Sequence, residues 1–256
     1  MADTLTFLGT GTSQGIPVIG CTCPVCQSDA PEDRRFRTSA MVSEGDRHVI
    51  IDVGPDFRMQ MLRTGVDNIE GVLITHEHND HVAGLDDVRP FNFKWQKDIP
   101  IFGRKPVLEN IQSRFAYIFK DNKYPGIPRL NLREIEAYDT FEFGSMEWTP
   151  LLVYHGDLPV LGFRTGDLTY ITDANKIPDK TERLIRGSRI LVLNALHKSK
   201  HHSHFNLDEA VEIVRRVDPE RAYFTHISHR MGLHKEIEKQ LPDRIHLAYD
   251  GLKVTI

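Results

Sequence analysis

The sequence predicts an α/β fold of the α+β kind, in which two β-sheets pack face to face and helices cover their outer faces. Three observations predict it. Short runs rich in β-branched and aromatic residues recur along the chain, helical patterns fall between some of them, and 40% of the 256 residues are hydrophobic, which allows a sizeable core. No repeat, low-complexity tract or Pro/Ser linker divides the chain, so we expect one domain over residues 1–256.

The strands are predicted from short apolar or alternating runs that end at turn residues. They span Thr4–Leu8, Ser39–Ser43, His48–Val53, Val72–Thr75, Met146–Val153, Leu161–Thr165, Leu168–Thr172, Ile190–Leu193, Arg221–Thr225 and Leu252–Ile256. In this interpretation the first half of the chain is mostly consecutive strands, and the second half mixes strands with helices.

Helices are predicted where apolar residues recur at helical spacing, in Phe57–Thr64, Pro106–Phe119, Leu207–Val217 and Leu233–Gln240. The third of these has a start motif, because Asn206 is a good N-cap residue and Glu209 follows three positions later. Residues 120–130, which contain two prolines and a glycine, are expected to form a loop that acts as a flap.

Charge and hydropathy exclude several classes of partner. Acidic residues exceed basic ones by 36 to 32, and the formal net charge of -4 gives no electrostatic footprint for a long nucleic acid. No apolar run approaches the roughly 18 residues of a membrane span, and the N-terminus lacks the features of a signal peptide. We therefore expect a cytoplasmic enzyme with a small substrate, and a homodimer is the common oligomeric state of such enzymes.

The strongest chemical motif is the run His76-Glu77-His78-Asn79-Asp80-His81, which follows the predicted strand Val72–Thr75. Imidazoles two positions apart on a tight turn can converge on one ion, and Asp80 and His81 can reach a second ion nearby. Imidazole together with carboxylate suits Zn, Mn or Fe. The alternative, a solvated loop that is rich in histidine by chance, would rarely produce this spacing.

This motif resembles the signature of the metallo-β-lactamase fold superfamily. The resemblance implies a four-layer αββα sandwich, with two mixed sheets covered by helices and a pair of metal ions at one edge of the sheets. It also implies three further ligands, each directly after a strand. His155, Asp173 and His226 stand at such positions, after Leu151–Tyr154, Tyr170–Thr172 and Tyr223–Thr225.

The implied ligand sets share one carboxylate. One ion would be held by His76, His78, His155 and Asp173. The other would be held by Asp80, His81, His226 and Asp173, which bridges the pair. The resemblance further places Asp52, at the end of the strand His48–Ile51, beside the histidine loop as a hydrogen-bond partner of a ligand. Asp250 is a second candidate for such a role, or a simple turn residue before Gly251.

Three cysteines cluster in one loop, as Cys21-x-Cys23-x-x-Cys26. Tetrahedral zinc needs a fourth ligand, and His229, three residues after His226, can supply it. A redox pair or simple burial of the thiols is the alternative interpretation.

The cysteine loop is similar to that of one branch of the superfamily, the cyclic phosphodiesterases of bacterial phosphonate degradation (the carbon–phosphorus lyase pathway), where such a loop and a late histidine hold a structural zinc. The resemblance runs nearly end to end. It covers Gly9–Gly15, the cysteine loop, the histidine motif, Thr172-Asp173, His204–Ala210 and Thr225–His229. The Gly9–Gly15 loop could present N–H groups to an anion, but a tight turn is the preferred interpretation.

The function implied by the resemblance is hydrolysis of a small cyclic phosphate, either 5-phosphoribosyl 1,2-cyclic phosphate or a nucleoside 2′,3′-cyclic phosphate. A hydroxide that bridges two divalent ions, Mn or Zn or else Fe, would attack phosphorus. His204 would protonate the leaving oxygen, so His204 and Asp80 are the predicted catalytic residues. The neighbouring histidines, at 197, 201 and 202, match nothing in the branch.

Other functions remain possible on the sequence alone. A tRNA 3′-processing endonuclease shares the core motif but carries a long arm, whereas only residues 156–172 separate His155 from Asp173. A β-lactamase or thioesterase is a third reading, and Asp80 argues against the β-lactamases that use cysteine as a later ligand. A flavodiiron oxidoreductase would need a flavin domain, and a non-catalytic binding module would show damaged ligands.

Overall fold

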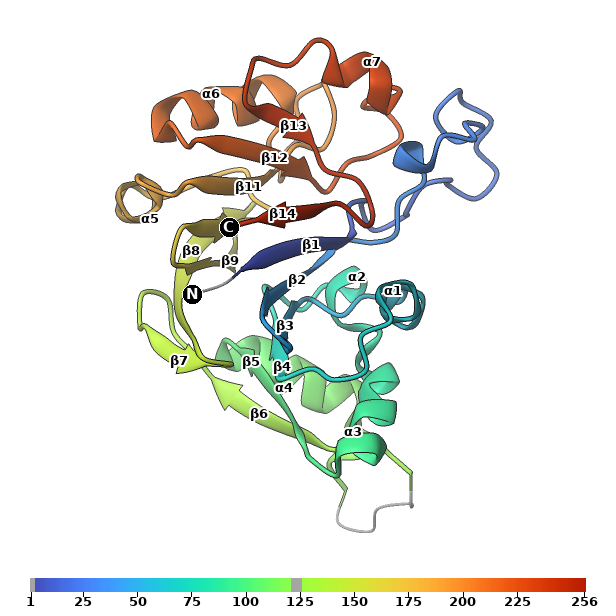
Figure 1. The fold of residues 1–256 in the computed structure, drawn as a ribbon, viewed down its shortest axis with the longest axis vertical. Helices are drawn as coiled ribbons and strands as arrows, with labels where there is room; N and C mark the ends of the chain where they lie inside the picture. The colour runs from blue at the N-terminus through green and yellow to red at the C-terminus, as the bar shows by residue number, and fades with distance from the viewer. Residues whose placement is uncertain (1–2, 121–125) are drawn as a thin grey trace.

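The computed structural model describes residues 3–120 and 126–256. Within them, two seven-stranded mixed sheets lie face to face with helices outside, so the predicted αββα sandwich is confirmed (Figure 1). The sheet orders are β14-β1-β2-β3-β4-β5-β6 and β13-β12-β11-β10-β9-β8-β7. Among these residues, no helix combines the length and the apolar character that crossing a membrane requires.

The first sheet combines an antiparallel half with a parallel half. Strands β14, β1, β2 and β3 pair antiparallel, and β3, β4, β5 and β6 pair parallel. Their bounds are β1 Thr4–Gly9, β2 Ser39–Glu44, β3 Arg47–Ile51, β4 Gly71–Leu73, β5 Ile99–Gly103, β6 Leu130–Glu134 and β14 Lys253–Thr255. Because parallel strands end at the same edge, the loops after β3, β4 and β5 meet there.

The second sheet repeats this plan. Strands β7 to β10 pair antiparallel, and β10 to β13 pair parallel. Their bounds are β7 Phe141–Phe143, β8 Met146–His155, β9 Leu158–Thr165, β10 Leu168–Tyr170, β11 Ile190–Asn194, β12 Arg221–Thr225 and β13 Ile245–Leu247. The two halves of the molecule are therefore similar in architecture.

Helices α1 to α4 lie beside the first sheet, and α5 to α7 lie beside the second (Figure 1). They span α1 Phe57–Thr64, α2 Asn79–Val82, α3 Arg89–Trp95, α4 Lys105–Arg114, α5 Asp179–Ile185, α6 Leu207–Val217 and α7 His234–Glu238. Short 3₁₀ turns add η1 Pro31–Asp33, η2 Leu85–Val88 and η3 Ala116–Ile118.

Three buried apolar layers hold these parts together. The central layer, between the sheets, includes the fully buried Phe7, Trp148 and Tyr170. One outer layer joins the first sheet to α1, α3 and α4, and the other joins the second sheet to α5, α6 and α7. Such two-sided burial explains why the parallel strands are continuous apolar runs rather than alternating ones.

Several predicted elements are confirmed and others were missed. Helices α1 and α6 have the predicted bounds, and the Asn206–Glu209 capping box is formed. The prediction that the first half is mostly consecutive strands is wrong, because α1 to α4 lie within it. The predicted flap over residues 120–130 falls partly on residues outside those described, and from Leu130 the chain belongs to β6.

Candidate metal centres

The histidine motif forms the connection that follows β4 and contains the single turn α2. His76 lies just beyond the strand and is fully buried, whereas His78 is exposed and occupies the N-cap position of α2 without a side-chain capping hydrogen bond. Asp80 and His81 stand within α2, where Asp80 is 9% exposed and His81 is fully buried. A strand end and one helical turn therefore direct the four side chains to one place.

The three later residues reach this turn from the second sheet. His155 ends β8, and Asp173 and His226 follow β10 and β12. Their ligand atoms join those of the motif in three groups, each within 4.8 Å. The groups are His76 with His78 and His155, His76 with His81 and Asp173, and Asp80 with His81 and His226. All seven residues predicted for the dinuclear site thus converge at the edge where the two sheets meet.

Asp173 occupies the middle of this assembly and is 2% exposed. One carboxylate oxygen, Oδ2, lies 3.3 Å from Nε2 of His81, and the other, Oδ1, lies 3.0 Å from Nε2 of His226. Asp173, His226 and Asp52 have φ angles of 53°, 55° and 63°, which non-glycine residues rarely adopt. Backbone strain of this kind persists where the surrounding structure holds a functional side chain in place.

Three of the ligand histidines, His76, His81 and His155, are oriented through their Nδ1 atoms. Nδ1 of His81 lies 2.7 Å from Oδ2 of Asp52, and Nδ1 of His155 lies 2.8 Å from the carbonyl oxygen of Ser203. Nδ1 of His76 lies 2.9 Å from Oγ1 of Thr75. When Nδ1 donates to such a partner, Nε2 keeps its lone pair and faces the centre, as metal-ligating histidines usually do.

Asp52 supports both ligand groups. It is fully buried and accepts hydrogen bonds from the N–H of Thr75 at 2.8 Å and from its hydroxyl at 2.8 Å, in addition to His81. Since that hydroxyl also meets Nδ1 of His76, one carboxylate orients His81 directly and His76 through Thr75. Asp250 does not contact a predicted ligand but accepts hydrogen bonds from Thr10 and from the N–H of Phe36.

Electrostatics in the cluster favour cations. Burial alone would raise the pKa of Asp173, yet His226 and His81 hold it well below its ordinary value. Burial alone would lower the pKa of His81, but Asp173, Asp80 and Asp52 raise it well above the usual range. The carboxylates are therefore ionised, and without metals His81 and His226 hold a proton more tightly than a free imidazole does.

Divalent cations fit these residues. The buried Nε2 atoms of His81 and His226 lie 3.3 and 3.0 Å from the carboxylate oxygens of Asp173 but form no well-directed hydrogen bond with any described residue, although buried polar atoms are normally paired. Nε2 of His76 and Nδ1 of His78 lie 3.0 Å apart, a spacing suited to two nitrogens that share one ion. The nitrogen and oxygen donors suit Zn, Mn or Fe and do not select one of them.

His204 lies against the same centre and is 8% exposed. Its ring stacks on that of His226 with centroids 4.7 Å apart, and its Nδ1 lies 3.8 Å from Oδ1 of Asp173. Burial, followed by the charge of His226, lowers the pKa of His204 to about 2, so the imidazole is neutral in the free protein. Of the neighbouring histidines, His202 is exposed, His201 has its ring centroid 5.2 Å from that of His204, and His197 contacts His201.

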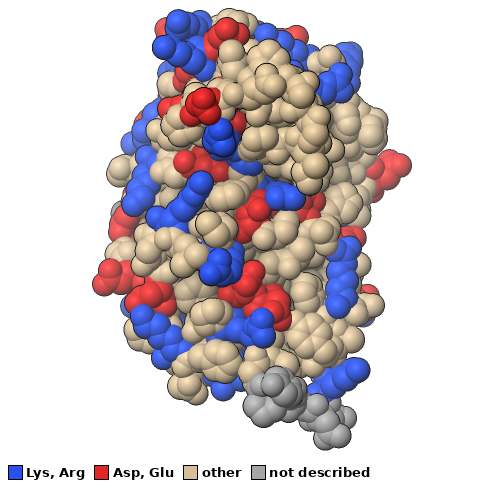
Figure 2. Space-filling model, turned by 90° about the vertical axis from the view of Figure 1, so that its right-hand side faces the viewer, with Lys and Arg blue, Asp and Glu red and all other residues tan. Residues whose placement is uncertain are grey.

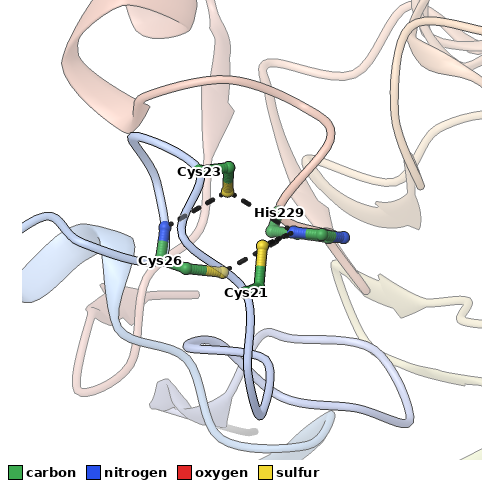
Figure 3. Close-up of side chains that lie close together, drawn as sticks. All are labelled: Cys21, Cys23, Cys26 and His229. Atoms are coloured by element: carbon green, nitrogen blue, oxygen red, sulfur yellow. Dashed lines mark hydrogen bonds between the residues drawn. The ribbon is translucent and has the colours of Figure 1, made fainter.

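The cysteine loop forms a second candidate metal site (Figure 3). Nδ1 of His229 lies 3.2, 3.5 and 3.6 Å from the sulfurs of Cys21, Cys23 and Cys26. Tetrahedral zinc with Zn–S of about 2.3 Å and Zn–N of about 2.0–2.1 Å requires N···S spacings of about 3.5 Å. The four predicted ligands thus surround a space that zinc fits.

Backbone N–H groups support the thiolates. The N–H of Cys26 points at the sulfur of Cys23 at 3.5 Å, and the N–H of Val18 points at the sulfur of Cys26 at 3.3 Å. The first of these contacts lowers the pKa of Cys23 to about 6, whereas burial raises the pKa of Cys26 to about 11. All three cysteines are free thiols in the structure, so none is used in a disulfide.

Sequence reasoning missed the residues that hold the ligands in place. Thr75 and Ser203 contact ligand histidines through a hydroxyl and a carbonyl group, respectively. A threonine beside a histidine carries no spacing pattern, and a backbone carbonyl carries no residue identity at all. The Gly9–Gly15 loop is a close-packed turn, because a Cβ at Gly9 would lie 2.0 Å from the carbonyl oxygen of Arg37.

Comparisons with known proteins identify the fold and the family. A family model described as the Beta-lactamase superfamily domain matches residues 47–227. A crystal structure of a diphosphatase from the PhnP family is 39% identical, with a TM-score of 0.93 over 100% of this chain and 98% of that one. Zinc-bound PqqB from Methylobacterium extorquens is 18% identical, with a TM-score of 0.80 over 99% of this chain and 100% of that one.

A curated relative from Porphyromonas gingivalis, named Octanoyltransferase, is 37% identical over 252 residues, which is 98% of this chain. The match covers 51% of that relative, so the chain spans about half its length. The family match and the similarity to the diphosphatase over the whole chain both agree with the fold. The chain therefore belongs to the β-lactamase superfamily, in its PhnP-like branch.

Proposed function

We propose that the protein is a metal-dependent hydrolase with two divalent ions, acting on small cyclic phosphodiesters. The observation that carries the proposal is the position of Asp173, whose two carboxylate oxygens face His81 and His226 at 3.3 and 3.0 Å. Membership in the superfamily and the similarity to a diphosphatase support hydrolysis at phosphorus. When bound, a pair of divalent ions would supply an activated water and neutralise charge on the phosphate oxygens.

The residues of the chain would divide the work between binding and orientation. His76, His78 and His155 would hold one ion, and Asp80, His81 and His226 the other, with Asp173 shared between them. Asp52 and the carbonyl group of Ser203 keep Nε2 of the ligand histidines directed at the ions. The exposed side of His78 leaves the centre open to solvent and substrate.

His204 would donate a proton to the leaving group. Hydrolysis adds a hydroxyl group to phosphorus and a proton to the oxygen that leaves. Nδ1 of His204 points toward Asp173 and has no hydrogen-bond partner among the described residues. The imidazole is neutral in the free protein, and an anionic phosphate beside it favours its protonation. His204 then gives this proton to the leaving alkoxide, a step worth about 10²–10⁴ in rate.

A small substrate fits the surroundings of the centre. Residues 156–172, which connect His155 to Asp173, form the compact strands β9 and β10 with their turns and carry no extended arm. On the face shown in Figure 2, basic and acidic side chains are interspersed rather than gathered into one basic field. Both features favour a small phosphate over a long RNA.

The test is steady-state hydrolysis by purified protein loaded with Mn²⁺ or Zn²⁺. We expect turnover of ribose 1,2-cyclic phosphate or nucleoside 2′,3′-cyclic phosphates and of bis(p-nitrophenyl) phosphate, and no cleavage of precursor tRNA. A diphosphate ester belongs in the same panel, because the 39% identical neighbour is a diphosphatase. If only the diphosphate is hydrolysed, the proposed cyclic-phosphate substrate class is wrong, whereas the proposed hydrolytic metal centre stands. If no phosphate substrate is hydrolysed, the proposed function is wrong.

The role of His204 has a sharper test. His204→Ala should lower kcat by about 10²–10⁴ for substrates with an alkoxide leaving group, and far less for p-nitrophenyl esters, whose leaving group needs no proton. His202→Ala is the matched control, because His202 is exposed. An equal loss for both leaving groups would show that His204 does not act as the acid.

A further inference from the structure

The two candidate metal centres share one short segment of chain. His226, predicted to bind a catalytic ion, is followed within three residues by His229 of the cysteine site. His226 has a φ of 55°, which strains a residue with a Cβ. Something outside the segment must therefore hold it in this conformation.

The segment is fastened directly after His226. The N–H of Ile227 donates to the carbonyl oxygen of Thr10 at 2.8 Å, and Ile227 forms an isolated parallel bridge with Gly11. The N–H of Ser228 donates to the carbonyl oxygen of Leu196 at 2.9 Å. Of these contacts, the one to Thr10 is adjacent to His226 and connects it to the glycine loop after β1.

Thr10 is itself held by two charged groups, of which Arg35 is buried and Asp250 partly buried. Nη1 of Arg35 donates to the hydroxyl oxygen of Thr10 at 2.7 Å, and that hydroxyl donates to Oδ1 of Asp250 at 2.7 Å. Thr10 is fully buried, and Arg35 is 4% exposed. We call Thr10, Arg35 and Asp250 the Thr10 clamp.

The clamp spans segments that are distant in the sequence. Besides Thr10, Nη1 of Arg35 donates to the carbonyl oxygen of Ala248 at 2.5 Å, and Nη2 lies 3.2 Å from Nδ1 of His234. Burial lowers the pKa of Arg35 to about 10, which leaves the guanidinium charged at neutral pH. The direct acceptors of this buried charge are neutral groups, and the nearby carboxylates of Asp250 and Asp33 offset part of the cost of burying it.

We propose that the Thr10 clamp positions His226 for the ion held by Asp80, His81 and His226, so that Thr10 and Arg35 control the affinity of this one ion. The inference rests on the dinuclear centre of the proposed function. It predicts an asymmetric effect, because the ion held by His76, His78 and His155 has no ligand on the clamped segment.

The experiment uses Thr10→Val, which has nearly the same shape but neither donates to Asp250 nor accepts from Arg35. Thr10→Ser keeps the hydroxyl and should rescue the effect. Thr181→Val is the matched control. Thr181, in α5, is fully buried, and its hydroxyl donates to the carbonyl oxygen of Leu152 at 2.6 Å. Stepwise Mn²⁺ binding is measured by calorimetry with zinc already on the cysteines, and the Mn–Mn coupling is followed by electron paramagnetic resonance.

We expect Thr10→Val to weaken one of the two Mn²⁺ steps by about 10- to 100-fold and leave the other unchanged, with loss of the coupled Mn–Mn signal at limiting metal. Thr10→Ser and Thr181→Val should bind both ions as the wild type does, even where Thr181→Val lowers Tm. Equal weakening of both steps, or two steps of wild-type affinity in Thr10→Val, overturns the inference while the dinuclear centre stands. A wild-type protein that binds no second ion overturns the proposed function and the inference together.

Discussion

Replacing Asp52 by asparagine tests how the ligand histidines are oriented. The four closest contacts to the carboxylate of Asp52 come from groups that can donate: the N–H of Thr75, its hydroxyl, which lies near both oxygens, and Nδ1 of His81. The side-chain amide of asparagine has one acceptor oxygen and one donor nitrogen in place of two acceptor oxygens. At least one of the groups that now donate to Asp52 would therefore face the amide N–H. If the amide faces His81, the imidazole must accept at Nδ1 and carry its proton on Nε2, where the ion should bind.

The magnitude follows from this geometry. A lost hydrogen bond to a buried donor costs about 1–3 kcal/mol, or about 5- to 160-fold in an equilibrium constant, which brackets the loss of about 10- to 100-fold in metal affinity that is typical when the partner of a ligand histidine is changed. Because Asp52 orients His81 directly and His76 through Thr75, both ions should bind more weakly. This outcome differs from the one-ion effect expected for the Thr10 clamp.

The assay is Mn²⁺ binding by calorimetry, with kcat/KM measured at saturating metal. Asp56→Asn is the control, because Asp56 is a partly buried carboxylate that pairs with Arg37 and contacts no ligand histidine. If Asp52→Asn binds both ions with wild-type affinity, the orientation argument is refuted. Loss of affinity in the Asp56→Asn control as well would point to a general effect of removing buried charge.

Three more predictions each concern one of the metal centres. Asp80→Ala should reduce turnover to background with an unchanged circular dichroism spectrum; substantial remaining activity would contradict the ligand assignment. Cys23→Ser should lower the zinc content by one and reduce Tm more than it reduces kcat of the surviving protein, because structural zinc contributes to folding; unchanged Tm would contradict that role. Asp173 and its neighbours raise the pKa of His226 to about 9 against the effect of burial, so the metal-free protein holds a proton there that is lost only as pH rises through 9. Metal binding must displace this proton, so affinity should rise by about tenfold or more per pH unit below 9, and more steeply where a proton on His81 is displaced as well. Proton release should be seen in buffers of different ionisation enthalpy, and pH-independent binding would refute the prediction.

The sequence predicted the parts of the fold that carry strong local patterns. Helix α6 has its capping box and an apolar face, and its bounds were correct. Strand β5 was missed because Pro100 interrupts a short run, and α3 was missed because it has only seven residues, with a proline at its start. Helix α2 is a single turn inside the histidine motif, too short to leave a periodic pattern.

The later ligands, His155, Asp173 and His226, were predictable because the family resemblance implied a ligand at the end of each of three strands, and each of them lies at or just after a strand end. The residues that orient them were not, apart from Asp52. Arg35 contacts Thr10, Ala248 and His234 only because the fold brings the chain ends together, and no spacing in the sequence encodes that meeting. Motifs thus predict which atoms gather at a site, whereas the fold decides what holds them.

The central claim is that Asp173 joins two ions in one centre. Anomalous diffraction from crystals of the Mn²⁺-loaded protein tests it directly. We predict two ions about 3.5–4 Å apart, with Asp173 touching both, and a zinc ion on Cys21, Cys23, Cys26 and His229. A single ion among the histidines, or two ions that do not share Asp173, would contradict the account.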